Sequence, residues 1–280
     1  MKIQVGEINI NAEYLSEIKP EKEYLFLIHG FTGSAKDWLE PPLSGQSICE
    51  QLDDRFNKIA IDLIGHGKSD TTKIVNHYSA ESISSQIDAV ITTFTQKKVI
   101  LAGYSMGGRA ALTFAANSPG KLKGLILESS SAGIKKHSER KIRVDSDEQL
   151  AEFILQNDIN AFLTKWMDQE LFGTLKRFSN SKLEVLKKAR LHNKPIALAN
   201  TLRSFGLGVM PFLGDKLSEL NFPVLLLTGQ LDSRFTRINA QLQKQFPKAK
   251  HIVVTNSGHN IHLEEPKRFV KSVNKFLEEF

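Results

Sequence analysis

The sequence has few of the features that mark secreted, membrane-spanning or disulfide-stabilised proteins. Cys49 is the single cysteine of its 280 residues, so no internal disulfide can form. Apolar runs such as Tyr24–Ile28 and Val224–Leu227 are far shorter than the roughly 18 residues of a transmembrane helix. The N-terminus leads directly into the alternating segment Ile3–Ile10, without the apolar core of a secretory signal. We therefore expect a cytoplasmic protein that does not span a membrane.

Cofactor motifs are also missing. The sequence has no Walker loop, and no G-x-G-x-x-G motif opens a strand–helix–strand unit, so no nucleotide cofactor is expected. The histidines do not show the Cys and His spacings of a zinc site. His66 lies in the loop Asp62–Ser69 and is expected to be structural. We therefore expect neither a metal nor an organic cofactor.

The charge balance is basic, with a formal net charge of +6 and a pI near 9.2. The basic residues are spread along the chain without an arginine-rich tract, which argues against a nucleic-acid partner. A solvated surface and a small acidic substrate remain as explanations. With 41% apolar and 24% charged residues, the composition is that of a globular protein, either a monomer or a small homo-oligomer.

Strand and helix patterns alternate over most of the chain. Short, mostly apolar runs predict strands buried on both faces, at 23–28, 58–62, 98–103, 124–128, 223–229 and 251–255. Helical patterns lie between or after them, at 46–56, 79–95, 106–117, 238–246 and 266–277. This alternation predicts an α/β fold, with a mostly parallel sheet covered by helices on both faces.

The alternation stops between 132 and 210, where only helical patterns occur, at 149–156, 159–167, 182–191 and 195–205. We interpret 132–210 as a helical cap inserted into an α/β core made of 1–131 and 211–280. The Gly206-Leu207-Gly208 segment marks the expected return to the core.

The segment Gly103-Tyr104-Ser105-Met106-Gly107 matches the G-x-S-x-G motif and lies between a predicted strand and a predicted helix. That context is what the motif requires, because a sharp strand-to-helix turn lifts the serine Oγ above the sheet. The start of the helix also favours negative charge at this position. Ser105 is therefore the candidate reactive residue.

A serine hydroxyl needs an imidazole to take its proton and a carboxylate to orient that imidazole. Asp232 and His259 each follow a late predicted strand, which gives the chain order Ser, Asp, His of the α/β-hydrolases. Loops beyond the carboxyl ends of parallel strands gather at one edge, so the three side chains are expected to meet. The alternative for Asp232 is a turn residue, and for His259 taken alone it is a surface or structural histidine.

The loop His29–Gly33 follows the early strand and is typical of a loop that supplies a backbone donor to an oxyanion. The backbone N–H groups of Phe31 and Met106 are the expected pair of donors. The glycines are also explained by a tight turn that needs positive φ, and both explanations can hold.

Together these segments resemble the α/β-hydrolase superfamily and, within it, the 2-succinyl-6-hydroxy-2,4-cyclohexadiene-1-carboxylate synthases of the menaquinone pathway. Arg109, directly after the double glycine of the elbow, is the most specific match. The other matches are Gly103–Gly108, Glu128–Gly133, Glu139, Arg140, Arg143, Asp145, Phe162, Trp166, Arg190, Gly258–Asn260 and His262. Two positions depart from the family, Ala132 in place of a usual proline and Gln230 in place of a common glutamate.

The resemblance implies a lyase that eliminates pyruvate from 2-succinyl-5-enolpyruvyl-6-hydroxy-3-cyclohexene-1-carboxylate, a small polycarboxylate. In that scheme Ser105 is the base, His259 activates it, Asp232 orients His259, and Phe31 and Met106 stabilise the oxyanion. The implied substrate-binding residues are Tyr104, Arg109, Arg143, Trp166 and Arg190. The guanidinium groups of Arg109, Arg143 and Arg190 have a geometry that suits carboxylates. A solvated helix face explains each arginine of the cap equally well.

Two other functions remain open. A carboxylesterase, thioesterase or carbon–carbon hydrolase would use the same elbow and triad, because a fold does not fix the chemistry. A ligand receptor on the same fold is the third hypothesis, although a receptor would not need Ser105, Asp232 and His259 together.

Overall fold

The computed structural model describes residues 1–43 and 45–280. Its centre is an eight-stranded sheet in the order β1-β2-β4-β3-β5-β6-β7-β8, in which β3 to β8 are parallel and the β1–β2 hairpin is antiparallel. The strands are β1 (Lys2–Val5), β2 (Ile8–Glu13), β3 (Glu23–Ile28), β4 (Phe56–Asp62), β5 (Val99–Tyr104), β6 (Leu122–Glu128), β7 (Val224–Gly229) and β8 (Ala249–Val254). The predicted α/β class is confirmed.

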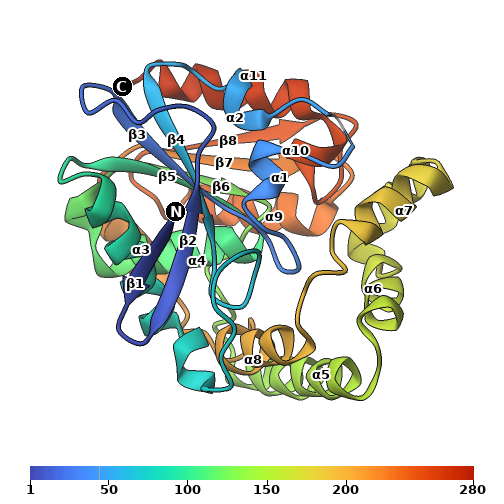
Figure 1. The fold of residues 1–280 in the computed structure, drawn as a ribbon. Coiled ribbons are helices and arrows are strands. Elements are labelled where there is room, and N and C mark those ends of the chain that lie inside the picture. Colours follow the sequence, from blue (N-terminus) through green and yellow to red (C-terminus); the bar gives the residue numbers. More distant parts are fainter. Residues whose placement is uncertain (44) are drawn as a thin grey trace.

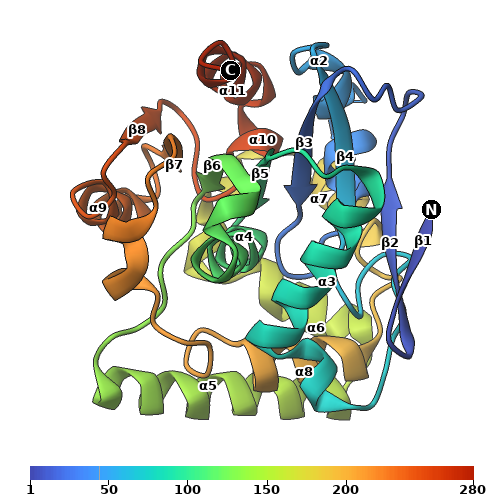
Figure 2. The ribbon, with the colours of Figure 1, turned by 90° about the vertical axis from the view of Figure 1, so that its left-hand side faces the viewer.

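Helices cover both faces of the sheet (Figures 1 and 2). One face carries α3 (Ala80–Phe94), α4 (Met106–Asn117) and α9 (Ser233–Gln243), with the 3₁₀ turns η1 (Val75–Tyr78), η2 (Pro119–Lys121) and η4 (Gly214–Glu219). The other face carries α1 (Lys36–Leu39), α2 (Ile48–Gln51), α10 (Ile261–Glu264) and α11 (Pro266–Leu277). Along β3, Phe26 and Ile28 pack on the first face and Leu25 and Leu27 on the second. Burial on both faces explains why the strands read as continuous apolar runs.

The segment between β6 and β7 is helical. It contains α5 (His137–Gln156), α6 (Ile159–Met167), η3 (Glu170–Arg177), α7 (Asn180–Lys188) and α8 (Pro195–Phe205). Residues 132–210 are all described, and none of them forms a strand. Figure 1 shows α5 and α8 side by side below the sheet, with α6 and α7 rising along its right side. A small apolar cluster that includes Ile154, Phe162 and Leu198 holds α5, α6 and α8 together.

Several helix boundaries differ from the sequence expectations. Helix α5 begins at His137 rather than at 149. The sequence pattern missed its first half because that half has no apolar face and leaves Ile142 70% exposed. Helix α9 begins at Ser233 rather than at 238, since the Asp232 side chain caps it by accepting a hydrogen bond from Phe235 N at 3.0 Å. Helix α2 covers only Ile48–Gln51 of the expected 46–56.

Candidate active site

Ser105 lies at the turn from β5 into α4, in a backbone conformation that few non-glycine residues adopt, with φ 51° and ψ −108°. Two glycines permit this turn. A Cβ at Gly103 would collide with the carbonyl group of Gly107, and a Cβ at Gly107 would collide with the carbonyl groups of Ile28 and His29. Ser105 N also donates a hydrogen bond to the Glu128 carbonyl oxygen at 2.8 Å, which fixes the turn to the end of β6.

The structure brings Ser105, His259 and Asp232 into one hydrogen-bonded chain. His259 Nδ1 lies 2.7 Å from Asp232 Oδ2, and His259 Nε2 lies 3.0 Å from Ser105 Oγ. A carboxylate only accepts hydrogen bonds, so we assign the His259 proton to Nδ1, which leaves Nε2 to accept from the Ser105 hydroxyl. The other Asp232 oxygen accepts from Phe235 N, so the N-terminus of α9 orients the carboxylate.

Aromatic rings surround His259, which is only 1% exposed. The ring centroids of Phe235, Tyr104 and Phe172 lie 4.6, 5.5 and 6.0 Å from that of His259. Burial, followed by the nearby charge of Glu128, raises the pKa of Tyr104 well above its ordinary value, so this ring is a neutral wall. The apolar surroundings strengthen the hydrogen bonds of the chain by excluding water.

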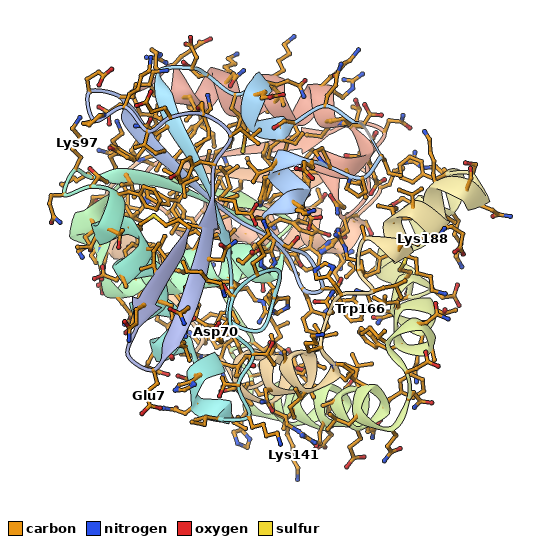
Figure 3. The ribbon with its side chains drawn as sticks, viewed as in Figure 1. Glu7, Asp70, Lys97, Lys141, Trp166 and Lys188 are labelled. Carbon is orange, nitrogen blue, oxygen red and sulfur yellow. The ribbon has the colours of Figure 1, made fainter. Side chains whose placement is uncertain are left out.

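A cavity opens over Ser105, and most of the residues expected at the site line it. Phe31, Tyr104, Met106, Arg109, Arg143 and Trp166 all contribute to its wall. Figure 3 shows Trp166 on the side of α6 that faces the core, and its ring centroid lies 5.0 Å from that of Phe31. The remaining lining comes from Ser129–Ser131, Leu171, Phe172, Thr201, Leu202, Phe205–Leu207, Arg234 and Phe235.

Arg109 brings a partly buried positive charge to this cavity. Its Nη1 donates to the Phe205 carbonyl oxygen at 2.7 Å, and its guanidinium lies 5.1 Å from the Phe205 ring centroid. Burial, followed by the charge of Arg143, lowers the pKa of Arg109 to about 10, so the group stays protonated at neutral pH. Among the ion pairs of the described residues, none places a carboxylate on Arg109. An anionic ligand would supply the missing countercharge.

Arg143 extends the basic side of the cavity from α5. Its Nε donates to Asp147 Oδ1 at 2.8 Å, one helical turn away. Burial raises the pKa of Asp147, against the opposing effect of Arg143. One acidic group therefore faces two guanidinium groups, and the charge near Arg109 and Arg143 is positive on balance.

Arg190 does not share the cavity of Ser105. It follows α7 and lines a neighbouring cavity together with Gly30–Gly33 and Asp37. Its Nη1 lies 2.6 Å from Asp37 Oδ1, and both side chains are mostly buried. The two cavities share Phe31, Tyr104, Trp166 and Phe172. Arg109 and Arg143 thus line the cavity of Ser105, whereas Arg190 lines the neighbouring cavity and forms an ion pair with Asp37.

The loop around His66 is structural, as its sequence suggested. The Asp62 carboxylate accepts hydrogen bonds from Ala35 N at 2.6 Å and Lys68 N at 2.9 Å, which fixes two loops to the end of β4. His29 Nε2 accepts from Leu63 N at 3.1 Å. The described residues contain no group of three His, Cys, Asp or Glu side chains able to hold a metal ion.

The sequence reasoning assigned no role to some residues of the site, although Ser130 lies within the matched stretch Glu128–Gly133. Ser130 Oγ donates to the Ser105 carbonyl oxygen at 3.0 Å, and Arg234 lines the cavity from the first turn of α9. Glu264 accepts a hydrogen bond from Gly258 N at 2.9 Å, next to His259. Ser130 and Arg234 lie in segments that follow the carboxyl ends of β6 and β7, and this placement was the available signal.

Comparison with known proteins agrees with this geometry. The family model described as alpha/beta hydrolase fold matches residues 24–266. A Bacillus subtilis protein with the provisional name 2-succinyl-6-hydroxy-2,4-cyclohexadiene-1-carboxylate synthase is 36% identical over 255 residues, which cover 91% of this chain and 90% of that protein. The chain belongs to this synthase branch of the α/β-hydrolase fold family. It is therefore an enzyme of that superfamily.

Further members of the synthase family and one of its solved structures are also similar. The Citrobacter koseri 2-succinyl-6-hydroxy-2,4-cyclohexadiene-1-carboxylate synthase is 30% identical over 92% of this chain and 95% of its own length. The structure of MenH from S. aureus superimposes with a TM-score of 0.87 at 28% identity, covering 96% of this chain and 98% of that one. A Thermogutta terrifontis esterase has a TM-score of 0.83 at 21% identity over 100% of this chain and 98% of its own, which shows a shared fold alone.

Proposed function

We propose that this enzyme eliminates pyruvate from 2-succinyl-5-enolpyruvyl-6-hydroxy-3-cyclohexene-1-carboxylate, giving 2-succinyl-6-hydroxy-2,4-cyclohexadiene-1-carboxylate in menaquinone biosynthesis. The observation that carries this proposal is the unpaired guanidinium of Arg109 in the cavity onto which Ser105 opens. A pocket for a neutral ester has no use for two guanidinium groups that share one carboxylate, whereas a polycarboxylate compensates the excess positive charge. The family relationship supports the same substrate.

In the proposed reaction Ser105, His259 and Asp232 act as a base. Ser105 Oγ takes the ring proton at the carbon that bears the succinyl group, while its own proton passes to His259 Nε2. The electron pair of the broken C–H bond forms a ring double bond, the existing double bond shifts, and the C–O bond to the enolpyruvyl group breaks. The leaving enolate takes up one proton to become pyruvate, and this balances the proton that the His259 imidazolium gives up to restore the enzyme. Asp232 stabilises the imidazolium at 2.7 Å.

Negative charge develops on the succinyl carbonyl oxygen during this step, and we assign its stabilisation to the backbone N–H groups of Phe31 and Met106. Both residues line the cavity beside Ser105. Met106 is the first residue of α4, so its N–H has no acceptor within the helix. Donors held in this way typically contribute a hundred- to a thousandfold in rate.

Residues 132–210 are assigned to a cap over the core of 1–131 and 211–280. They supply Arg143, Trp166, Phe172 and Phe205 to the cavity wall. A lid of this kind holds the reacting atoms away from water. We also assign the enzyme to the cytoplasm, with no cofactor, since the elimination is redox-neutral and needs only a base. None of the described helices is long and apolar enough to cross a membrane.

The experiment that tests this function mixes the purified enzyme with the enolpyruvyl substrate and measures pyruvate through its reduction by lactate dehydrogenase and NADH. We expect rapid pyruvate release by the wild type and a loss of a thousandfold or more in Ser105→Ala. Arg109→Ala should reduce this activity far more than any hydrolysis of 4-nitrophenyl acetate. Fast ester hydrolysis without pyruvate release would instead identify a carboxylesterase.

A further inference from the structure

Glu128, the last residue of β6, contacts both halves of the proton-transfer chain. Its carbonyl oxygen accepts a hydrogen bond from Ser105 N at 2.8 Å. Its carboxylate accepts from His262 N through Oε1 at 3.0 Å, and Oε2 lies 2.7 Å from His262 Nδ1. Since His262 follows His259 by three positions, one residue links the serine turn to the segment that carries the catalytic imidazole.

The pair of Glu128 and His262 is almost fully buried, with 1% and 3% of the two residues exposed. Aromatic rings enclose it, because the ring centroids of Trp38, Tyr104 and Phe269 lie 4.3, 5.0 and 5.8 Å from that of His262. A carboxylate only accepts hydrogen bonds, so we assign a proton to His262 Nδ1. In such water-poor surroundings the two hydrogen bonds are strong and the loss of either partner is costly.

The segment that carries His259 is held on both sides of that residue. Glu264 accepts a hydrogen bond at 2.9 Å from the backbone N–H directly before it, and Glu128 accepts from the backbone N–H of His262 after it. Asp232 orients the imidazole ring itself. Glu128 therefore fixes the backbone under the ring, relative to the strand end to which the serine turn is also bonded.

A buried carboxylate–imidazole pair is a demanding way to join two segments, since apolar residues of similar volume often stabilise a fold as well or better. The pair does supply a defined geometry, because its two hydrogen bonds restrict both distance and angle between β6 and α10. We propose that Glu128, paired with His262, is a positioning residue for the catalytic base. It holds His259 Nε2 within hydrogen-bonding distance of Ser105 Oγ, at 3.0 Å, and so sets the rate of proton transfer. This inference rests on the base of the proposed function, whichever substrate supplies the proton.

The test compares Glu128→Ala and Glu128→Gln with the control Asn57→Ala. The buried Asn57 side chain also makes two hydrogen bonds, to the backbone of Lys19, but it lies at the amino end of β4, away from the active site. We expect Glu128→Ala to lower kcat for pyruvate release about tenfold or more, with KM changed less than about threefold. Asn57→Ala should leave kcat unchanged, although both alanine variants lower the melting temperature.

The glutamine variant separates positioning from general stability. Its side-chain oxygen accepts from His262 N and its amide group donates to Nδ1 of the other imidazole tautomer, so kcat should return to within about threefold of the wild type. A kcat of folded Glu128→Ala within about twofold of the wild type, an equal fall in Asn57→Ala, or no recovery in Glu128→Gln would overturn the inference. If Glu128→Ala does not fold, His262→Phe takes its place, because it keeps the ring packing and removes Nδ1.

Labelling of Ser105 by phenylmethylsulfonyl fluoride tests the same inference without the enolpyruvyl substrate. The reagent reacts with a serine whose proton the imidazole removes, so Glu128→Ala should be labelled about tenfold more slowly than the wild type and Asn57→Ala at the wild-type rate. Equal labelling rates for Glu128→Ala and the wild type would contradict the inference. Normal labelling of a wild type that releases no pyruvate would instead contradict the proposed function alone.

Discussion

Two buried histidines near the active site, His29 and His66, make the stability of the fold depend on pH. The rings of His29 and His66 lie with their centroids 5.1 Å apart, and both side chains are almost fully buried. Since His29 Nε2 accepts from Leu63 N, a proton on that nitrogen would face another N–H group. Burial, followed by the proximity of His29, lowers the pKa of His66 to about 3. Both rings are therefore neutral in the folded enzyme.

A neutral buried histidine makes the fold sensitive to acid. The unfolded chain binds a proton at His66 near pH 6.5, whereas the folded chain does so only near pH 3, so stability is complete above pH 6.5 and is lost as the pH falls between these values. We expect His66 alone to remove roughly 2 kcal/mol of unfolding free energy between pH 7.5 and pH 5. Urea unfolding at the two pH values measures this loss.

The matched variants for this prediction are His66→Asn and His137→Asn. His137 is exposed at the start of α5 and should leave the pH-dependent loss unchanged. His66→Asn should make the loss smaller, whatever its effect on stability at pH 7.5. An identical loss in the wild type and in His66→Asn would contradict the assignment of a neutral buried ring.

For individual residues, the sequence predicted the positions of Ser105, Asp232 and His259, because each follows a strand whose carboxyl end fixes its place. The sequence could not show that Arg234 lines the cavity of Ser105 and that Arg190 does not. Whether an arginine meets Asp37 or an open cavity depends on how α7, α8 and α9 pack, which no local pattern encodes.

Among the elements, η3 of the insertion is tied to the loop that carries His259. Arg177 Nη2 lies 2.8 Å from Glu264 Oε2, and the Glu264 side chain is 1% exposed. The same glutamate accepts a hydrogen bond from Gly258 N at 2.9 Å. Arg177 Nη1 and Nη2 also donate to Asn256. This network makes the placement of His259 depend on the placement of η3.

We predict that Arg177→Gln slows the enzyme without removing any group from the cavity. Glu264 would lose the partner of its buried charge, and the His259 loop would be held less firmly, so kcat should fall about three- to tenfold. Lys176→Gln is the control, because its ion pair with Asp168 is exposed and contributes little. Pyruvate release and melting temperature are measured for both, and equal kcat values would contradict the coupling.

The elements themselves were predictable where a helix has an apolar face. The expected 159–167, 195–205 and 266–277 coincide with α6, α8 and α11. The start of α5 was not predicted, because charged residues lie on all sides of that part of the helix and hydrophobic periodicity gives no signal there. Its N-terminal half is held by contacts such as the hydrogen bond from Arg140 Nη2 to the Val209 carbonyl oxygen, which links residues far apart in the sequence.

For the whole molecule, the net charge of +6 gains a specific meaning. A substrate with three carboxylates is attracted by the overall field and by the arginines of the cavity, and dissolved salt screens both. We predict that kcat/KM for the enolpyruvyl substrate falls about three- to tenfold between 50 and 300 mM NaCl, with kcat nearly constant. Steady-state pyruvate release at each salt concentration measures this, and a neutral ester substrate should show no such decline.

The insertion between β6 and β7 also determines when the active site can exist. Leu125 pairs with Val224 in adjacent strands, so this part of the sheet closes only after the whole helical segment has been spanned. Closing so long a loop is entropically slow, and contacts distant in sequence form late in folding. Ser105 precedes this closure, whereas Asp232 and His259 follow it. A chain released early from synthesis, or one still folding, therefore holds a serine without its base and is chemically inert until the last strands have been added.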